Sequence, residues 1–292
     1  MSQTSPQSAG QLEILEAISE AGGAINDDRI GNSGDALWVL DGATDQSREK
    51  LLPGGSDAAW IADAFSAAFL DLAPGFSGSL FELAEGATAR VAARFEAEKL
   101  RPPAGRGFHP SAAGLLLRVR NGWAEVLGMG DSVLLASIPG APVRLTGTDP
   151  ARLGDRKAIE RIARFAAETG LSWVQARDEL HKRSAGVARA KMNLPGGYSV
   201  FSIDMPPREL VSEDHFPAPP GSLFLAMTDG FARLFDTFNA YTIESIMKAA
   251  ARKSLAALAQ ELRAIETSDA ECARFPRMKA VDDASAILAR VI

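Results

Sequence analysis

The stretch ALWVLDGATD, residues 36–45, decides how the fold of this 292-residue chain is interpreted. Its five apolar residues at 36–40 have the length and composition of a buried strand. The strand stops at Asp41-Gly42, a dipeptide typical of turns. A carboxylate is thereby placed at the end of a rigid, buried element, where two sheets packed face to face would have their rim.

Acidic residues adjoin predicted strands elsewhere in the chain as well. They are Asp27 and Asp28 in NDD (26–28), Asp131 in GMGDSVLL (128–135), Asp229 in LFLAMTDG (223–230), and Asp282 with Asp283 before the last strand. Carboxylates gathered at one rim would repel one another unless cations neutralise them. Ligands that are all oxygen favour Mg²⁺ or Mn²⁺ over Zn²⁺, and two such ions about 4 Å apart can activate water and bind phosphate. An Asp-Gly pair alone is more commonly a turn, so the pattern leaves both interpretations open.

Strand and helix patterns alternate in blocks along the chain. Strands are predicted at 12–19, 36–40, 112–119, 123–127, 132–138, 198–203, 222–228 and 284–292. Helices are predicted at 57–73, 79–100, 243–252 and 255–266, and Asp57 is placed to cap the first of them. Segregated blocks favour an α+β fold over a parallel βαβ sheet. We predict a four-layer α-β-β-α sandwich: two antiparallel sheets flanked by helical pairs.

Composition excludes several classes of protein. The chain is 46% hydrophobic and 23% charged, as a soluble globular protein is, and its net charge of −6 argues against general nucleic-acid binding. A single cysteine, Cys272, excludes an internal disulfide and a cysteine-based zinc cluster. His109, His181 and His215 form no recognisable metal-binding triplet. We expect no membrane span and no secretory signal, and therefore a cytoplasmic protein.

The ordered set NDD, VLDGAT, GMGDS, MTDGF and DDASAILARV resembles the metal-dependent protein phosphatases of the 2C class. Each motif alone is weak, but together they span residues 12–292 in family order. The family fold is an α-β-β-α sandwich, in agreement with the layering predicted from the blocks. The resemblance implies a phosphatase domain at 11–292 after a flexible segment at 1–10, and hydrolysis of phosphoserine and phosphothreonine in proteins by water activated between two Mg²⁺ or Mn²⁺ ions.

The resemblance also implies a role for each acidic position. Asp41, Asp229 and Asp282 would be the catalytic metal ligands: Asp41 would bridge both ions, the Gly42 carbonyl would bind one, and Asp229 and Asp282 would complete the shell of the second. Asp27 and Asp28 would orient water at the ions, Asp283 would support its neighbour, and Asp131 would belong to a weaker third metal position.

Two positions depart from the family pattern. Gly23 stands where the family usually has its phosphate-binding arginine, and Arg233 stands where it often has an aspartate for the third ion. Arg29 is a candidate substitute for the phosphate-binding arginine, or equally an exposed strand residue. These departures keep two alternatives open: a weak or inactive phosphatase fold that serves as a signalling or binding module, and a phosphatase for small phosphate esters.

Residues 151–192 are predicted to form an inserted helical flap. The segment holds ten basic and five acidic residues within an acidic protein. It could steer an acidic phosphorylated partner toward the site, but we favour a solvated helical face. The expected partners are a phosphorylated protein and a cognate Ser/Thr kinase, and neither nucleic acid nor a membrane. His109 is expected to be incidental and Trp38 to be part of the core.

Overall fold

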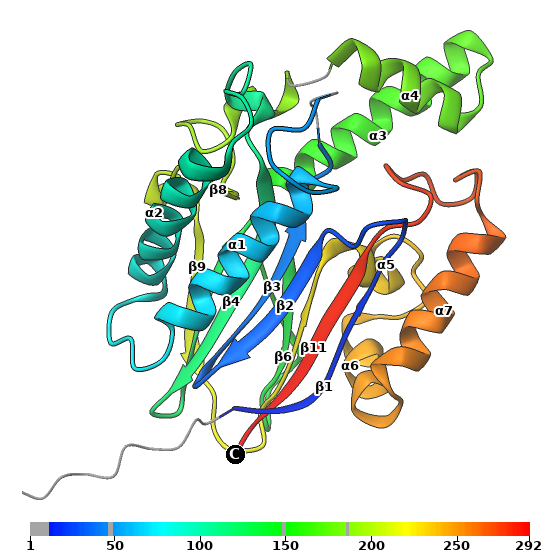
Figure 1. The fold of residues 1–292 in the computed structure, drawn as a ribbon. Coiled ribbons are helices and arrows are strands. Elements are labelled where there is room, and N and C mark those ends of the chain that lie inside the picture. The colour runs from blue at the N-terminus through cyan, green and yellow to red at the C-terminus, as the bar shows by residue number, and fades with distance from the viewer. Residues whose placement is uncertain (1–11, 46–48, 148–149, 185–186) are drawn as a thin grey trace, which may run out of the picture.

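The computed structural model describes residues 12–45, 49–147, 150–184 and 187–292. Within these ranges the strands form two antiparallel sheets that face each other, with helices on both outer sides (Figure 1). This confirms the predicted four-layer sandwich of the α+β class. The N-terminal segment 1–10, predicted to be flexible, lies outside the described residues.

The two sheets are built from both halves of the chain. One has the order β2-β3-β4-β5-β9, with β8 paired to β4: β2 (Asp28–Ser33), β3 (Ala36–Gly42), β4 (Ser111–Arg120), β5 (Trp123–Met129), β8 (Phe201–Ser202) and β9 (Ser212–Pro217). The other has the order β1-β11-β10-β6-β7: β1 (Leu12–Glu20), β6 (Val133–Ser137), β7 (Arg144–Thr146), β10 (Leu223–Met227) and β11 (Ala284–Val291).

Each sheet is covered by its own helices. On the β2-β3-β4-β5-β9 sheet lie α1 (Asp57–Leu72) and α2 (Leu80–Glu98), and on the other lie α5 (Asp229–Asp236), α6 (Ile243–Arg252) and α7 (Leu255–Ser268). Each sheet was expected to carry a helical pair, and α5 adds a short third helix to the second one. The short α5 starts directly after β10, so the rim residue Asp229 occupies its first turn.

Strand β3 is buried on both faces, as its unbroken apolar run predicts. Trp38 and Leu40 face the core beneath α1 and α2, where the Trp38 ring lies 5.7 Å from that of Phe69. Leu37 and Val39 face the core between the two sheets. Burying a large apolar side chain stabilises a fold by roughly 1.5–3 kcal/mol, so β3 is held rigidly and Asp41 at its end has a fixed position.

The start of α1 differs from the prediction that Asp57 caps it. Ser56 is the N-cap, and its hydroxyl accepts a hydrogen bond from Ala59 N. The Asp57 carboxylate instead accepts hydrogen bonds from the amides of Leu51 and Leu52, at 3.0 Å each. The carboxylate therefore fixes the incoming loop, while the shorter serine side chain satisfies the free N–H group of the helix.

Two helices lie in the segment predicted as a flap. They are α3 (Pro150–Thr169) and α4 (Trp173–Ser184), and Figure 1 shows them extending beyond the end of the sandwich. From α4, Trp173 Nε1 donates to the Arg277 carbonyl at 2.9 Å, and Arg177 donates to the Met278 carbonyl at 3.0 Å. Helix α4 is thus attached to the loop that leads into Asp282. Among the described residues no helix combines the length and apolarity that crossing a bilayer requires.

The prediction of a strand at 198–203 is wrong for most of that range, since β8 covers only Phe201–Ser202. The side chain of Asn193 explains the difference. It accepts a hydrogen bond from Val200 N at 2.9 Å and donates to Val200 O at 3.1 Å, while its backbone N–H bonds to the Tyr198 carbonyl. An asparagine side chain therefore takes the backbone partners that a neighbouring strand would supply.

Candidate metal centre

Four aspartates from both sheets converge at one rim of the sandwich. Asp28 and Asp41 are opposite each other in the β2–β3 pair. Burial raises the pKa of Asp41 well above its ordinary value, and the charges of Asp229 and Asp28, a hydrogen bond with Asp229 and the charge of Asp282 raise it further. Side chains that shift one another's pKa in this way lie close together, although they span more than two hundred positions of sequence.

Asp28 joins the two sheets at this rim. Its Oδ2 accepts a hydrogen bond of 2.9 Å from Thr228 Oγ1, and the Thr228 hydroxyl in turn accepts one from Ser285 N at 3.0 Å. The other oxygen, Oδ1, is buried and has no hydrogen-bond partner among the described residues. Burial raises the pKa of Asp28 to about 8, against the opposing hydrogen bonds of Ser285 and Thr228. Buried polar atoms are normally hydrogen-bonded, so Asp28 Oδ1 is suited to a ligand that the protein itself does not supply.

Asp282, by contrast, already has cationic partners. Arg233 Nη2 donates to its Oδ2 at 2.6 Å, and Lys279 Nζ donates to its Oδ1 at 2.6 Å. Burial and the charge of Asp229 raise the Asp282 pKa, while Arg233 and Lys279 lower it. The position that the resemblance assigned to the second ion is therefore bordered by two protein cations. The sequence alone showed that Arg233 departs from the family pattern, but it gave no sign that Lys279 belongs to the site.

Asp27 and Asp283 support the loop around the centre. The two Asp283 oxygens accept hydrogen bonds from the amides of Gly22 and Asp27, at 2.7 Å each. Asp27 Oδ1 accepts a hydrogen bond of 2.6 Å from Ser56 Oγ, and burial raises the pKa of Asp27 despite this bond. The Asp283 carboxylate thus ties β11 to the loop before β2, which keeps Asp28 in register with Asp41.

The glycines after the two central aspartates are required by close backbone approach. A Cβ atom at Gly42 would lie 2.6 Å from the Ala58 carbonyl oxygen, and one at Gly230 would lie 1.9 Å from the Asp283 carbonyl oxygen. Neither position has room for a side chain. Gly42 is the last residue of β3 and Gly230 is the second residue of α5, so close packing, and not the turn that Asp-Gly pairs suggest, requires glycine at both places.

The two remaining predicted residues, Asp131 and Arg29, have different surroundings. Asp131 follows Gly130, whose added Cβ would lie 2.5 Å from Ala113 Cβ, and Ala113 is the cross-strand partner of Asp41. The third-site candidate is thus on the same rim. Arg29 is differently placed: its guanidinium pairs with Asp63 and donates to the carbonyls of Asn26 and Asp28. Binding phosphate would require breaking that ion pair.

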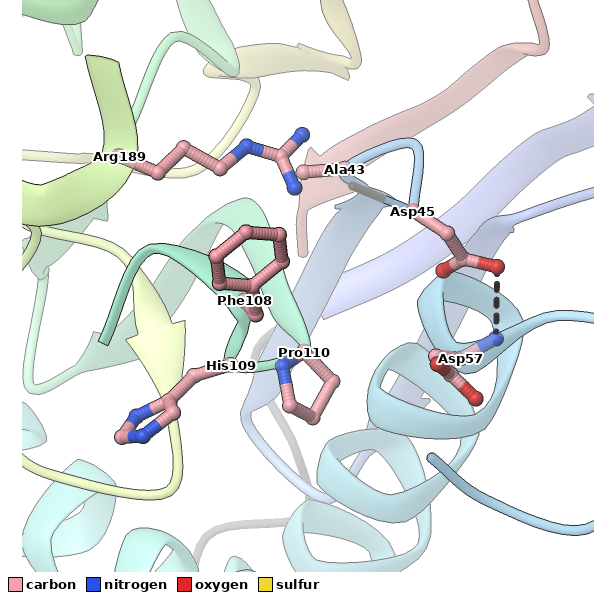
Figure 2. Close-up of a pocket in the computed structure, with 7 residues that line it drawn as sticks. All are labelled: Ala43, Asp45, Asp57, Phe108, His109, Pro110 and Arg189. Carbon is pink, nitrogen blue, oxygen red and sulfur yellow. Dashed lines mark hydrogen bonds between the residues drawn. The ribbon is translucent and has the colours of Figure 1, made fainter. Parts of the chain in front are cut away.

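A small pocket opens beside the rim (Figure 2). Its lining comprises Ala43, Asp45, Asp57, Phe108, His109, Pro110 and Arg189. Arg189, from the short 3₁₀ helix η2 (Ala188–Lys191), extends across the pocket toward Ala43, the residue after Gly42 (Figure 2). The Asp45 carboxylate accepts a hydrogen bond of 3.1 Å from the Ala58 amide in the first turn of α1. Sequence reasoning had counted Arg189 only as one of the basic residues of the flap.

The donor set fits a divalent cation in part. Asp41 and Asp229 are hard ligands of the kind that Mg²⁺ and Mn²⁺ prefer, and the unpartnered Oδ1 of Asp28 can accept a hydrogen bond from water at the ion. Asp282 does not fit, because both of its oxygens are bound by protein cations. Across the ranges described, no three Asp, Glu, His or Cys side chains are arranged together as a ligand set.

Comparisons with known proteins show the fold. No protein-family model matches the sequence, and no curated protein matches it. Among solved structures, PppA, a regulatory component of the T6SS in Pseudomonas aeruginosa, is 16% identical with a TM-score of 0.55, over 97% of this chain and 99% of that one. The Mycobacterium tuberculosis serine/threonine phosphatase PstP/Ppp is 14% identical with a TM-score of 0.56, over 96% and 98%. A structure of the PstP catalytic domain, in complex with two manganese ions, is 16% identical with a TM-score of 0.55, over the same shares. The chain therefore has the fold of the metal-dependent serine/threonine protein phosphatases.

Proposed function

We propose that the protein is a Mg²⁺- or Mn²⁺-dependent phosphatase that hydrolyses phosphoserine and phosphothreonine in other proteins. The observation that carries this proposal is the convergence of Asp28, Asp41, Asp229 and Asp282 at one rim, with a buried oxygen of Asp28 left without a partner among the described residues. A cluster that raises the pKa of its own members is costly for a fold. Such a cost is typical of a site whose purpose is to bind a cation.

The residues of the rim have distinct tasks in this proposal. Asp41, Asp229 and the Gly42 carbonyl would hold the divalent ion, which supplies Lewis-acid activation of water and neutralises charge on the phosphate. Asp28, fixed by Thr228, would orient the water that attacks phosphorus in line. The chain offers no cysteine nucleophile, because Cys272 is buried.

A phosphorylated protein is the substrate class that we propose. Support comes from PstP, a serine/threonine phosphatase with the same fold over nearly the whole chain. A Ser/Thr kinase that phosphorylates the same target would be the natural counterpart. A small phosphate ester as substrate would leave the chemistry unchanged, and a panel of phosphopeptides against sugar and nucleotide phosphates separates the two.

Metal removal tests the proposed activity. We expect hydrolysis of a phosphothreonine peptide to stop in EDTA and to return when Mn²⁺ or Mg²⁺ is added in excess of the chelator, because the rim carboxylates need a cation to bind phosphate. Release of inorganic phosphate measures the rate. A phosphatase rate that persists in EDTA would show that the proposed mechanism is wrong.

Arg189 is the arginine that we propose to contact the substrate phosphate in place of the arginine that the family has at the position of Gly23. We expect Arg189→Ala to raise KM for a phosphopeptide roughly 10-fold or more and to change kcat little, because a charge-assisted hydrogen bond contributes about 1.5–3 kcal/mol. The matched control is Arg183→Ala, which removes an exposed arginine of α4 paired with Glu179. Equal KM values for the two variants would contradict this role.

A second candidate function is a metal-binding module without turnover. The observation that favours it is the pairing of Asp282 with Arg233 and Lys279, which removes one expected metal ligand. Calorimetric binding of Mn²⁺ combined with no hydrolysis of any phosphopeptide or small phosphate ester would favour this module. Turnover that requires the metal would favour the phosphatase.

A further inference from the structure

The rim contains two side chains that are unusual partners for a metal ligand. Arg233 and Lys279 each place a charged nitrogen 2.6 Å from a different oxygen of Asp282. The carboxylate also accepts a hydrogen bond from the Asp283 amide at 3.1 Å, on the oxygen that Lys279 contacts. Asp282 is buried, and both of its carboxylate oxygens already accept hydrogen bonds from the protein.

Arg233 is locked in this position by a second buried carboxylate. Glu266, which is fully buried on α7, accepts a 3.0 Å hydrogen bond from Arg233 Nη1 on Oε1 and a 2.6 Å bond from Arg263 Nη1 on Oε2. Arg263 Nη1 also donates to the Asp282 carbonyl at 2.7 Å. Moving Arg233 away would leave Glu266 with one partner fewer in a buried place, which is costly.

Both cations are fixed next to Asp282 by the geometry of the rim. Lys279 lies three residues before Asp282, and Arg233 Nη1 bonds to Glu266 and also donates to the Lys279 carbonyl at 3.4 Å. Arginine and lysine side chains are cationic at neutral pH, so each brings a positive charge to Asp282.

The two protein cations occupy the side of the rim that a second divalent ion would need. Arg233 and Lys279 both pair with Asp282 and between them take both of its carboxylate oxygens, whereas neither cation forms an ion pair with Asp41 or Asp28 among the described residues. Glu266 is balanced separately by Arg263. Asp27 and Asp283 direct their oxygens to Ser56 and to backbone amides.

We propose that Arg233 and Lys279 stand in for one of the two divalent ions, so that the centre binds a single ion on the side of Asp41 and Asp229. The inference concerns the same rim as the proposed function and rests on it only in taking that rim as a metal centre. Asp282 then has a positioning role toward Arg233 and Lys279 and does not bind metal.

Counting bound ions tests this inference directly. We titrate Mn²⁺ into the EDTA-stripped full chain by isothermal calorimetry and count bound Mn²⁺ by electron paramagnetic resonance. One ion per chain is expected for the wild type. Lys279→Ala removes one positive charge from the rim at a half-exposed position, and we expect it to bind the ion roughly tenfold more tightly. The double variant Arg233→Asp, Lys279→Ala is expected to bind two ions.

The matched control is Lys253→Ala, which removes an exposed lysine paired with Glu261 and should leave both stoichiometry and affinity unchanged. Two ions on the wild type would overturn the inference and leave the proposed phosphatase intact. No ion would overturn both. If Lys279→Ala and Lys253→Ala bind Mn²⁺ with equal affinity, the inference is also overturned. This comparison of the two single variants tests the inference even when the double variant does not fold.

Discussion

Replacing Asp41 by Asn is expected to lower kcat/KM for phosphopeptide hydrolysis by roughly 10²–10³-fold or more, because it removes the carboxylate that lies between Asp229, Asp28 and Asp282 in the proposed metal centre. The same variant is expected to unfold at a higher temperature than the wild type in EDTA. Burial and three neighbouring carboxylates raise the pKa of Asp41, so the neutral amide relieves repulsion that the metal-free protein carries. Phosphate release and thermal unfolding followed by circular dichroism are the two measurements.

Asp71→Asn is the matched control for this substitution. Asp71 forms an exposed pair with Arg90, so its removal should change neither quantity by a noticeable amount. A loss of activity accompanied by a lower unfolding temperature would indicate a structural role for Asp41. Unchanged activity of Asp41→Asn would remove Asp41 from the catalytic centre.

The metal-free protein is expected to become less stable as the pH rises from about 4 to about 8. Asp28 has a folded-state pKa of about 8 against an ordinary value of 3.8, so the folded protein holds a proton that the unfolded chain has released. The contribution of this group is fully present below pH 3.8 and is lost as the pH rises through 8. Titration of Asp28 alone lowers the free energy of unfolding by at most about 1.4 kcal/mol for each unit that the pH rises.

Urea unfolding in EDTA at several pH values between 5 and 8 measures this slope. Asp28→Asn, which resembles the protonated side chain, should flatten it, and saturating Mn²⁺ should reduce it in the wild type by binding the ionised carboxylates. Asp63→Asn, at an exposed carboxylate, provides the control. A slope that is the same in Asp28→Asn as in the wild type would assign the pH dependence to other groups.

The fold was largely predictable because its central elements have distinctive sequences. Strand β3 has an unbroken apolar run, and the predicted bounds of α6 match the structure. The strands that the sequence did not reveal are polar or short: β2 reads DRIGNS and β9 reads SEDHFP, and β7 has three residues. Such segments become strands because they pair with neighbouring strands in the folded sheet, and this pairing leaves no pattern in their own sequence.

The sequence indicated which carboxylates lie near one another but not their partners. The order of the acidic motifs singles out Asp41, Asp229 and Asp282, and the structure brings the three side chains to one rim, while their role as metal ligands stays a prediction. The sequence did not reveal that Arg233 and Lys279 pair with Asp282. Arg233 lies on α5 and Lys279 lies three residues before Asp282, and no local pattern links the two to that carboxylate. Glu266 was hidden for a related reason: on α7 it has the sequence appearance of a solvated helix residue, yet it is fully buried.

Anomalous diffraction from a manganese-soaked crystal of the full chain tests the central claim most directly, because it locates the cation among the carboxylates without requiring a substrate. We predict one strong peak bordered by Asp41 and Asp229, with the Asp282 side chain still held by Arg233 and Lys279. A rim without any peak, or manganese bound only at carboxylates elsewhere on the molecule, would contradict the account.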